Sequence, residues 1–274
     1  MDRVEVTTLR REVEAARAHG TDQDPRKLIR WAHGLLGSKL MMSTAFGKSG
    51  MVILHLVREI APNLPIYFLN TGFHFAETLA YAEELRKKWN LNLILKLPKV
   101  HGDAFTKEYG ERLYQVDPDL CCHKNKVEPF DEILQEHQGW ITGVRRDQGQ
   151  SRAQAEPLEL LEGGMLKIQP LVTWKLEDVQ KYISEHDIPL HPLFADGFTS
   201  IGCEPCTKRP LVPGDERSGR WAGIAKKECG LHTFWAKQKE TAEESQDTEE
   251  EESEDTPPKE DEDSEGGLQQ GTGS

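Results

Sequence analysis

The feature that most constrains the fold of this chain is a repeated alternation of short apolar runs and longer helical patterns. Residues 65–70 (PIYFLN) and 92–97 (NLILKL) are branched or aromatic runs typical of buried strands, and residues 75–89 between them have helical length. Strands that alternate with such helices predict βαβ units and a mostly parallel sheet. We therefore expect a three-layer α/β fold in which helices flank the sheet. Further strands are expected at 39–46 and 139–144, a further apolar run at 167–174, and further helices at 1–36, 51–61, 127–137 and 176–187.

The net charge of −13 belongs to the C-terminal tail and not to the rest of the chain. Residues 238–274 hold 15 acidic and two basic residues, which leaves residues 1–237 with 32 of each sign. The tail has almost no apolar residues and cannot offset its ordering entropy by burial, so we expect it to be disordered. The neutral remainder offers no broad basic surface, so we expect no nucleic-acid partner.

Neither a membrane span nor a secretory signal is visible. No apolar run approaches the roughly 20 residues that a membrane-spanning helix needs, so we expect no membrane partner. The N-terminus is charged and lacks the apolar stretch of a signal peptide. We therefore expect a cytoplasmic protein, whose thiols stay reduced.

The five cysteines fall into three groups: an adjacent pair, Cys121 and Cys122, a CxxC pair, Cys203 and Cys206, and a single Cys229. Four thiolates can hold a tetrahedral zinc ion or a cubane iron–sulfur cluster. Adjacent cysteines are less usual in a zinc site, which generally takes two to four residues between its ligands. The spacing alone leaves an iron–sulfur cluster, a zinc ion and a redox disulfide as alternatives.

Cys229 has the surroundings of a reactive thiol. It lies between a basic pair, Lys226 and Lys227, and the small residue Gly230. Neighbouring cations lower the pKa of a thiol, and glycine gives access, so we expect a nucleophile. The alternative is an incidental exposed thiol.

Two loops that follow strands are candidates for binding an anion. Residues 43–50 (STAFGKSG) are rich in small residues and precede a helix, so backbone N–H groups can approach a phosphate. This is not a Walker A loop, because Met42 stands where that pattern needs glycine. Residues 69–72 (LNTG) follow the next strand and could bind a ligand or simply cap the next helix.

A third loop, after the strand at 139–144, holds Arg145, Arg146 and Arg152. Guanidinium groups bind phosphate and sulfate oxygens bidentately and keep their charge, so we expect a site for a small, multiply charged anion. The alternative is a surface loop in which these arginines pair with Asp147 and Glu156.

Taken together, these strings resemble the assimilatory adenylyl-sulfate reductases of the phosphoadenylyl-sulfate reductase group. The resemblance covers about residues 38–234 and is carried by STAFGKSG, LNTGFHFAET, CCHKNKVEP, TGVRRDQGQSR, SIGCEPCT and KKECGLH in this order. It implies an adenine-nucleotide α-hydrolase-like fold with a mobile C-terminal segment. With the helical pattern at the N-terminus and the charge of the tail, which lies outside the family pattern, we expect four segments: a helical N-terminal part (1–37), a nucleotide- and cluster-binding α/β domain (38–210), a segment with the catalytic cysteine (211–237) and the acidic tail (238–274).

The resemblance also implies a reaction. Cys229 would attack the sulfur of adenosine 5′-phosphosulfate (APS), AMP would leave, and an S-sulfocysteine would form. Thioredoxin, or a glutaredoxin-like reductant, would then release sulfite. Cys121, Cys122, Cys203 and Cys206 would bind one [4Fe-4S] cluster per subunit, and Lys126 would link cluster and substrate electrostatically. The resemblance assigns substrate binding to Ser43, Phe46, Gly47, Lys48, Ser49, Gly50, Leu69, Asn70, Thr71, Gly72, Lys126, Arg145, Arg146, Arg152 and His232.

The chain departs from the family pattern at Asn70, where aspartate is common, at Gly149, where serine is frequent, and at Asn125, where a basic residue often stands. Three alternatives stay open. A reductase of the same fold could prefer phosphoadenylyl sulfate (PAPS) or accept both substrates. A PP-loop ATP pyrophosphatase shares the sheet and the first loop, and a zinc-stabilised nucleotide-binding module would need no catalysis. The resemblance leaves room for a homo-oligomer.

Overall fold

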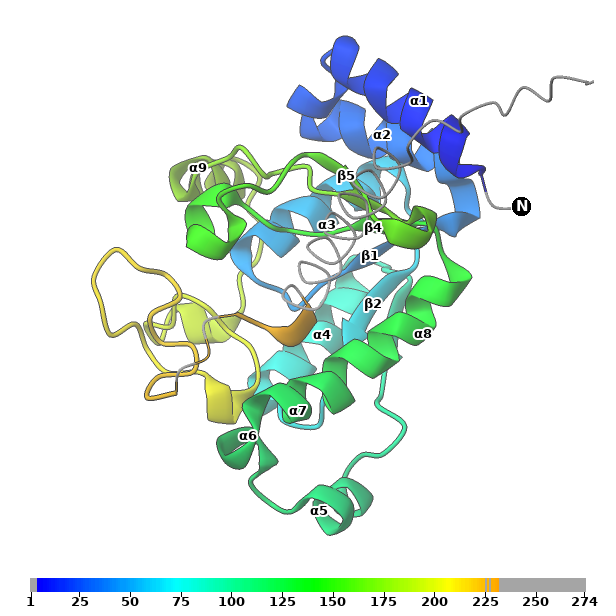
Figure 1. The fold of residues 1–274 in the computed structure, drawn as a ribbon. Helices are drawn as coiled ribbons and strands as arrows, with labels where there is room; N and C mark the ends of the chain where they lie inside the picture. The colour runs from blue at the N-terminus through cyan, green and yellow to red at the C-terminus, as the bar shows by residue number, and fades with distance from the viewer. Residues whose placement is uncertain (1–3, 225, 227, 232–274) are drawn as a thin grey trace, which may run out of the picture.

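A mixed six-stranded sheet forms the centre of the protein (Figure 1). This computed structural model describes residues 4–224, 226 and 228–231. The strands are β1 (Leu40–Ser43), β2 (Ile66–Leu69), β3 (Leu93–Lys96), β4 (Gly139–Ile141), β5 (Leu158–Leu160) and β6 (Leu166–Ile168). The helices are α1 (Val6–Ala18), α2 (Pro25–Leu36), α3 (Lys48–Ile60), α4 (Ala76–Lys88), α5 (Asp103–Tyr109), α6 (Leu113–Val116), α7 (Pro118–Cys122), α8 (Glu128–Glu136) and α9 (Leu176–Glu185).

The strand order is β3-β2-β1-β4-β6-β5, and every neighbouring pair is parallel except β5 with β6. The chain runs outward from β1 to β2 and β3 and then returns to place β4 on the other side of β1. Loops that follow β1 and β4 therefore diverge at this point, which is where open α/β sheets bind ligands. The expected α/β class, a mostly parallel sheet flanked by helices, is confirmed.

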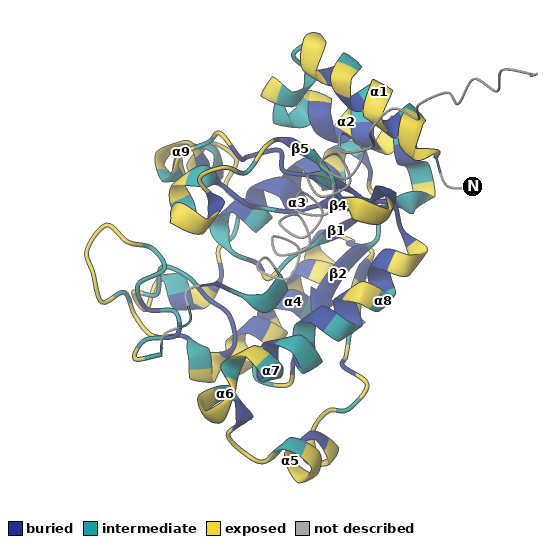
Figure 2. Cartoon of the chain, viewed as in Figure 1, coloured by how far each residue is buried: buried dark blue, intermediate teal, exposed yellow. Residues whose placement is uncertain are grey.

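Side chains alternate between the two faces of the sheet, as the strand period of two requires. Met42 and Phe68 point into the larger core, which is closed by α1, α2, α3, α4 and α9. Met41 and Tyr67 point to the opposite face, where Phe130 of α8 packs against the strands. Figure 2 shows the buried strands and the exposed outer sides of these helices. The three layers therefore follow from the sequence pattern.

Local signals fix the ends of the helices that carry this core. The Asp24 carboxylate accepts hydrogen bonds from the N–H groups of Arg26 and Lys27, and Pro25 occupies the first helical position of α2. Gly37 ends that helix with a positive φ of 52°, which glycine adopts without a steric penalty. Helix α3 is buried continuously from Met51 to Val57, because both the sheet and other helices cover it.

Two parts of the fold differ from the sequence prediction. Strand β5 was not expected, and residues 98–126, for which no helix or strand was predicted, hold α5, α6, α7 and most of a π-helical turn (His123–Val127). These elements are four to seven residues long, too short for periodicity to show. The Asp117 carboxylate caps α7 by accepting from Leu120 N–H, and Pro118 starts it.

The proposed segment boundaries at 37/38 and 210/211 stay predictions. Helices α1 and α2 share the larger core with the sheet, and the Gln138 side chain both accepts from Val4 N–H and donates to its carbonyl. The acidic tail and the rest of the expected mobile C-terminal segment, residues 232–274, lie outside the described residues. Among the described helices, none combines the length and the hydropathy that crossing a bilayer would take.

Candidate active site

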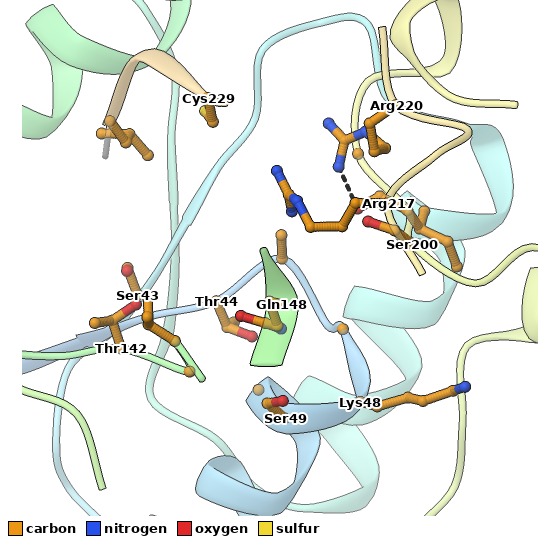
Figure 3. A pocket seen from close by; sticks show the side chains of 18 of the residues that line it. Ser43, Thr44, Lys48, Ser49, Thr142, Gln148, Ser200, Arg217, Arg220 and Cys229 are labelled. Atoms are coloured by element: carbon orange, nitrogen blue, oxygen red, sulfur yellow. Dashed lines mark hydrogen bonds between the residues drawn. The ribbon is translucent and has the colours of Figure 1, made fainter. Parts of the chain in front are cut away.

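A cavity of about 240 Å³ lies beyond the carboxyl ends of β1, β2 and β4. The loops after these three strands form one side of it, and residues from 194 to 231 form the other. Figure 3 shows side chains from both sides converging on the same space. Six cationic side chains line this cavity: Lys48, Lys126, Arg145, Arg152, Arg217 and Arg220. The site is therefore built to attract an anion.

The first loop, residues 43–50, lines the cavity with its backbone and small side chains more than with the charged side chain of Lys48. Ser43, Gly47, Ser49 and Gly50 line the cavity, and the N-terminus of α3 opens onto it. The free N–H groups of a helix N-terminus bind anions. The ammonium group of Lys48 lies 5.1 Å from the centre of the Phe194 ring, and Figure 3 shows it pointing away from Cys229.

Phe46 shapes this loop from behind. Its side chain is fully buried and packs against Phe68, with ring centroids 5.1 Å apart, so it lies in the core and does not line the cavity. Its φ of 57° is unusual for a residue with a bulky side chain. The Thr44 hydroxyl accepts a hydrogen bond from Phe46 N–H at 3.0 Å and supports this turn. The predicted role of Phe46 in substrate binding stays a prediction, since its side chain does not reach the cavity.

The second loop lies mostly outside the cavity, since only Leu69 of its four residues lines it. The Asn70 side chain accepts from Gly72 N–H at 3.1 Å, and the Thr71 hydroxyl accepts from Phe73 N–H at 3.2 Å. Gly72 takes a φ of 77°, which the turn requires. These contacts stabilise the turn itself; the alternative, a cap on the next helix, is not seen, because the N-cap residue of α4 is Phe75 and no side chain among the described residues caps it.

The arginines of the third loop are already paired with carboxylates. Arg145 is 1% exposed; it donates from Nη1 to Ser49 Oγ at 2.5 Å, from Nε to Asp147 Oδ1 at 2.8 Å and from Nη2 to Glu216 Oε2 at 2.7 Å. It thus fastens three loops to one another. Arg146 points elsewhere: it donates to Glu156 at 2.9 Å and does not line the cavity.

Arg152 lines the cavity but is held from behind. Its Nε and Nη2 groups donate to the two carboxylate oxygens of Glu228 at 2.9 and 3.0 Å, and Nη1 donates to Gln148 Oε1 at 2.5 Å. The structure therefore brings Arg145 and Arg152 to the cavity wall and leaves Arg146 outside it.

Two cavity arginines, Arg217 and Arg220, were missed by sequence reasoning. They lie in a charged string (DERSGRW) whose single glycine and polar residues look like a surface turn. Arg217 donates from Nη2 to Glu228 at 2.7 Å; burial first, and then the charge of Arg152, lower its pKa to about 10. Figure 3 shows its guanidinium group reaching into the cavity towards Cys229.

Arg220 has the fewest strong contacts of these arginines. It donates to the carbonyls of Ile201 and Cys206, both at 3.4 Å, and its guanidinium carbon lies 4.6 Å from the centre of the Trp221 ring. In the part of the chain that the structure describes, no carboxylate forms an ion pair with it. Its charge is therefore available to a ligand in the cavity.

Gly219 holds the loop that carries these two arginines. Its carbonyl accepts from Lys208 N–H at 2.8 Å, which closes the base of the loop. A Cβ atom at this position would meet the Lys208 carbonyl oxygen at 2.1 Å and the Arg209 carbonyl oxygen at 2.7 Å. Only glycine allows the two backbone segments at the base of the loop to approach so closely. The remaining missed lining residues include His74, Thr142, Gln148, Thr199, Ser200 and Leu231.

Four cysteines meet in a second, much smaller cavity of about 10 Å³. Cys121 and Cys122 come from α7, and Cys203 and Cys206 come from the loop that passes over it; all four are unpaired thiols. Burial first, and then the neighbouring thiols, raise the pKa of Cys121 to about 11. The Asn125 Oδ1 atom is buried beside them without a hydrogen-bond partner.

The donor set suits a cluster, because four cysteine thiols are the usual ligands of a [4Fe-4S] group. At about 10 Å³ the cavity would have to widen to admit one. No group of three or more Cys, His, Asp or Glu residues close enough to share one ion occurs between residue 4 and residue 231, wherever the structure describes the chain.

Lys126 lies between the two cavities and lines both of them. Burial alone would lower the pKa of its ammonium group, but the nearby sulfurs of Cys203, Cys229 and Cys122 outweigh burial and raise the pKa above its ordinary value. Lys126 is therefore a protonated, partly buried cation. Its Nζ atom lies 3.7 Å from Cys229 Sγ.

Cys229, the predicted nucleophile, lines the anion cavity. A hydrogen bond from Cys122 first, and then the charge of Lys126, hold the pKa of the Cys229 thiol well below its ordinary value despite burial. The hydrogen bond raises the pKa of Cys122 in return. Lys226, expected to activate this thiol, forms its ion pair with Asp119 instead. His232, the other predicted residue of this segment, lies outside the described residues.

Comparison with known proteins identifies the family. The family model of the phosphoadenosine phosphosulfate reductase domain matches residues 39–209. Adenosine 5′-phosphosulfate reductase 1 of Bacillus subtilis is 39% identical over 217 residues, which cover 77% of this chain and 93% of that protein. The adenosine 5′-phosphosulfate reductase of Streptomyces coelicolor is 38% identical and covers 77% of this chain and 89% of its own length.

Solved structures show the same fold. The phosphoadenylyl-sulfate reductase of Candida auris, in a phosphate complex, superposes with a TM-score of 0.61 at 27% identity, covering 70% of this chain and 95% of that one. The FMN adenylyltransferase of Candida glabrata reaches a TM-score of 0.51 at 18% identity, covering 72% and 67%, a likeness of fold alone. With the sheet order, the two cavities and these matches in agreement, this chain belongs to the phosphoadenosine phosphosulfate reductase family.

Proposed function

We propose that this chain reduces adenosine 5′-phosphosulfate to sulfite and AMP, with Cys229 as the nucleophile. One observation carries the proposal: the Cys229 thiol lines the same cavity as Lys126, Arg217 and Arg220, and its sulfur lies 3.7 Å from the Lys126 ammonium nitrogen, whose charge lowers the pKa of the thiol. A thiolate beside cationic side chains is suited to attack a sulfur whose oxygens carry negative charge. The relatives named as reductases of this substrate support the choice.

The first half-reaction is a transfer of the sulfo group to the enzyme. The Cys229 thiolate attacks the sulfur, the Sγ–S bond forms, and the S–O bond to the phosphate breaks with its electron pair leaving on AMP. Arg220 and Arg217 would bind the sulfate oxygens, and the α3 N-terminus with Ser49 and Gly50 would bind the phosphate. These groups neutralise charge that would otherwise repel the thiolate.

The second half-reaction regenerates the thiol. A reductant thiolate attacks Cys229 Sγ, sulfite leaves with the electron pair of the Sγ–S bond, and the second thiol of the reductant resolves the mixed disulfide. The sulfur gains two electrons, which come from the dithiol of thioredoxin or of a glutaredoxin-like protein. This chemistry needs reducing surroundings, which supports the cytoplasm as its compartment.

We also propose that Cys121, Cys122, Cys203 and Cys206 hold one [4Fe-4S] cluster. Their meeting in one cavity beside the partly buried cation Lys126 supports this. When bound, the cluster would supply charge next to Lys126 and not a route for electrons to the substrate. Iron analysis of anaerobically prepared protein should find about four irons per chain, and Cys203→Ser should lose most of them. A colourless protein with about one zinc would favour the zinc alternative.

The deciding experiment is the intact mass of the protein after incubation with APS and no reductant. A sulfonate adduct on Cys229, with AMP released in equal amount, is the expected result. Cys229→Ser should bind APS and form no adduct. If the native protein forms no adduct, or if Cys229→Ser still produces sulfite, the mechanism is wrong.

Two other substrates, PAPS and ATP, have to be distinguished from APS. PAPS is an alternative substrate because the similar C. auris protein is named as a PAPS reductase. Turnover of APS should exceed that of PAPS, and a preference for PAPS of about tenfold, or about 1.4 kcal/mol, would overturn the choice. The likeness of fold to an FMN adenylyltransferase keeps ATP cleavage as a rival. Release of pyrophosphate from ATP without any adduct would support that rival.

A further inference from the structure

We propose that Glu228 is a positioning residue that holds Cys229 against the arginines of the cavity. The proposal deepens the function proposed above and rests on it. Glu228 precedes the nucleophile in the chain and is 5% exposed. It does not line the cavity, so it does not touch the substrate. Its effect on the reaction passes through Cys229 and two guanidinium groups.

The Glu228 carboxylate accepts hydrogen bonds on both of its oxygens. Oε1 accepts from Arg152 Nη2 at 3.0 Å, from Arg217 Nη2 at 2.7 Å and from the backbone N–H of Cys229 at 2.8 Å. Oε2 accepts from Arg152 Nε at 2.9 Å and from Ser151 Oγ at 3.2 Å. A single carboxylate therefore joins the arginine loop after β4, the loop of Arg217 and the backbone of the nucleophile.

Charge explains why this arrangement needs a carboxylate. Arg152 and Arg217 are close enough that the charge of Arg152 lowers the pKa of Arg217. Glu228, placed between them, offsets this repulsion at a buried site where charges interact strongly. Charge-assisted hydrogen bonds of this kind are shorter and stronger than neutral ones. The position of residues 228 and 229 is thus set by the same cations that line the cavity.

This geometry couples the place of the nucleophile to the place of the sulfate. Arg217 donates to Glu228 at 2.7 Å. Its guanidinium group reaches into the cavity, as Figure 3 shows. A sulfate bound to Arg217 would then lie at a fixed offset from the Cys229 backbone. Holding reacting groups at a defined offset is itself a large contribution to rate.

The second anchor of this segment is of a different kind. Lys226 binds the Pro118 carbonyl and the Asp119 carboxylate, and the Asp119 side chain is 83% exposed. An ion pair with such an exposed partner contributes little. Both contacts lie on the N-terminal side of Cys229, and that of Glu228 is the stronger of the two.

The test compares Glu228→Ala, Glu228→Gln and a matched control, Glu156→Gln. Glu156 also accepts from an arginine at 2.9 Å, that of Arg146, but outside the cavity. Adduct formation on Cys229 in a single turnover should slow at least about tenfold in Glu228→Ala. Glu228→Gln, which can still accept from Arg217 and from Cys229 N–H, should recover part of that rate. The control should match the native protein.

Three further readouts separate positioning from a general loss of structure. AMP affinity and iron content of Glu228→Ala should stay within about twofold of the native values, because AMP lacks the sulfo group. Alkylation of Cys229 by iodoacetamide, followed by peptide mass, should become faster as the thiol is released from the cavity. This last readout needs no APS, so it tests Glu228 even if the proposed reaction is wrong.

Two results would overturn the proposal. One is Glu228→Ala forming adduct, or alkylating at Cys229, at the rate of Glu156→Gln. The other is a parallel fall of AMP affinity and adduct rate, with no recovery in Glu228→Gln, which would show a merely structural role. Failure of the native protein to form any adduct would instead refute the proposed function.

Discussion

Two groups of arginines differ in what they already bind: the first is that of the loop after β4, and the second is Arg220. Arg217 is intermediate, since it pairs with Glu228 and also lines the cavity. Arg145 and Arg146 of the first group are tied to Asp147, Glu216 and Glu156. Among the described residues, Arg220 of the second group donates to two backbone carbonyls, both at 3.4 Å, and pairs with no carboxylate. A string of arginines identifies a charged loop, whereas the pairing of each guanidinium group decides whether it can bind a ligand. The first group builds the cavity, and the second is placed to use it.

The largest effect that this comparison predicts is a loss of stability in Arg145→Ala. The substitution leaves Glu216 and Asp147 without their shared cation at a largely buried position. The free energy of unfolding should fall by about 3 kcal/mol, because breaking a buried ion pair strands the remaining charge. Urea titration measures this, and a loss below about 1 kcal/mol would show that Arg145 is not a structural link between the loops.

The next effect is a loss of affinity in Arg220→Ala. This guanidinium group has most of its hydrogen-bonding capacity free for an anion, so APS should bind roughly 30-fold more weakly. Unfolding in urea should change by less than about 1 kcal/mol, since no ion pair is lost. Calorimetry with APS measures the affinity, and AMP serves as the comparison ligand. Equal losses for AMP and APS would move Arg220 away from the sulfo group.

The dependence of APS affinity on ionic strength should distinguish the two groups by a smaller effect. Raising the ionic strength from about 0.05 to about 0.5 M should weaken APS binding several-fold, because exposed charges are screened over shorter distances. The dependence should flatten in Arg220→Ala and stay unchanged in Arg146→Ala. An unchanged slope in Arg220→Ala would contradict a direct contact with the anion.

The smallest effect is expected for Arg146→Ala. Its side chain is 38% exposed and its partner Glu156 is 52% exposed. Such pairs contribute about 0.5 kcal/mol, so stability and APS affinity should both stay close to the native values. A fall in affinity above about fivefold would restore Arg146 to the binding site that its sequence position suggests.

The sequence predicted the parts of the fold that depend on period. The alternation of Met41 and Met42 between two cores and the helix of buried residues at 51–57 follow directly from the pattern of apolar side chains. Strand β5 did not show, because its three residues include Glu159, whose carboxylate pairs with Lys167 on the neighbouring strand. A cross-strand ion pair is invisible until the strands are placed side by side.

The site was predicted less evenly, for a similar reason. The grouping of four cysteines and the separation of Cys229 from them could be read from spacing, and the structure places them accordingly. The pairing of Arg145 with Glu216 joins residues 71 positions apart, and that of Arg152 with Glu228 joins residues 76 apart. Such partners depend on tertiary structure. The sequence could therefore show where the cations are, but not which of them already pair with a carboxylate.

Gly219 adds a consequence for mutational tolerance. Its missing side chain keeps the loop closed on the Lys208 and Arg209 carbonyls, and the two arginines on either side depend on that closure. It contributes no atom to the cavity lining. In a library of single substitutions selected for activity, position 219 should nevertheless be as depleted as the nucleophile itself. A map of tolerated substitutions would therefore mark a residue that no inventory of chemical groups would include.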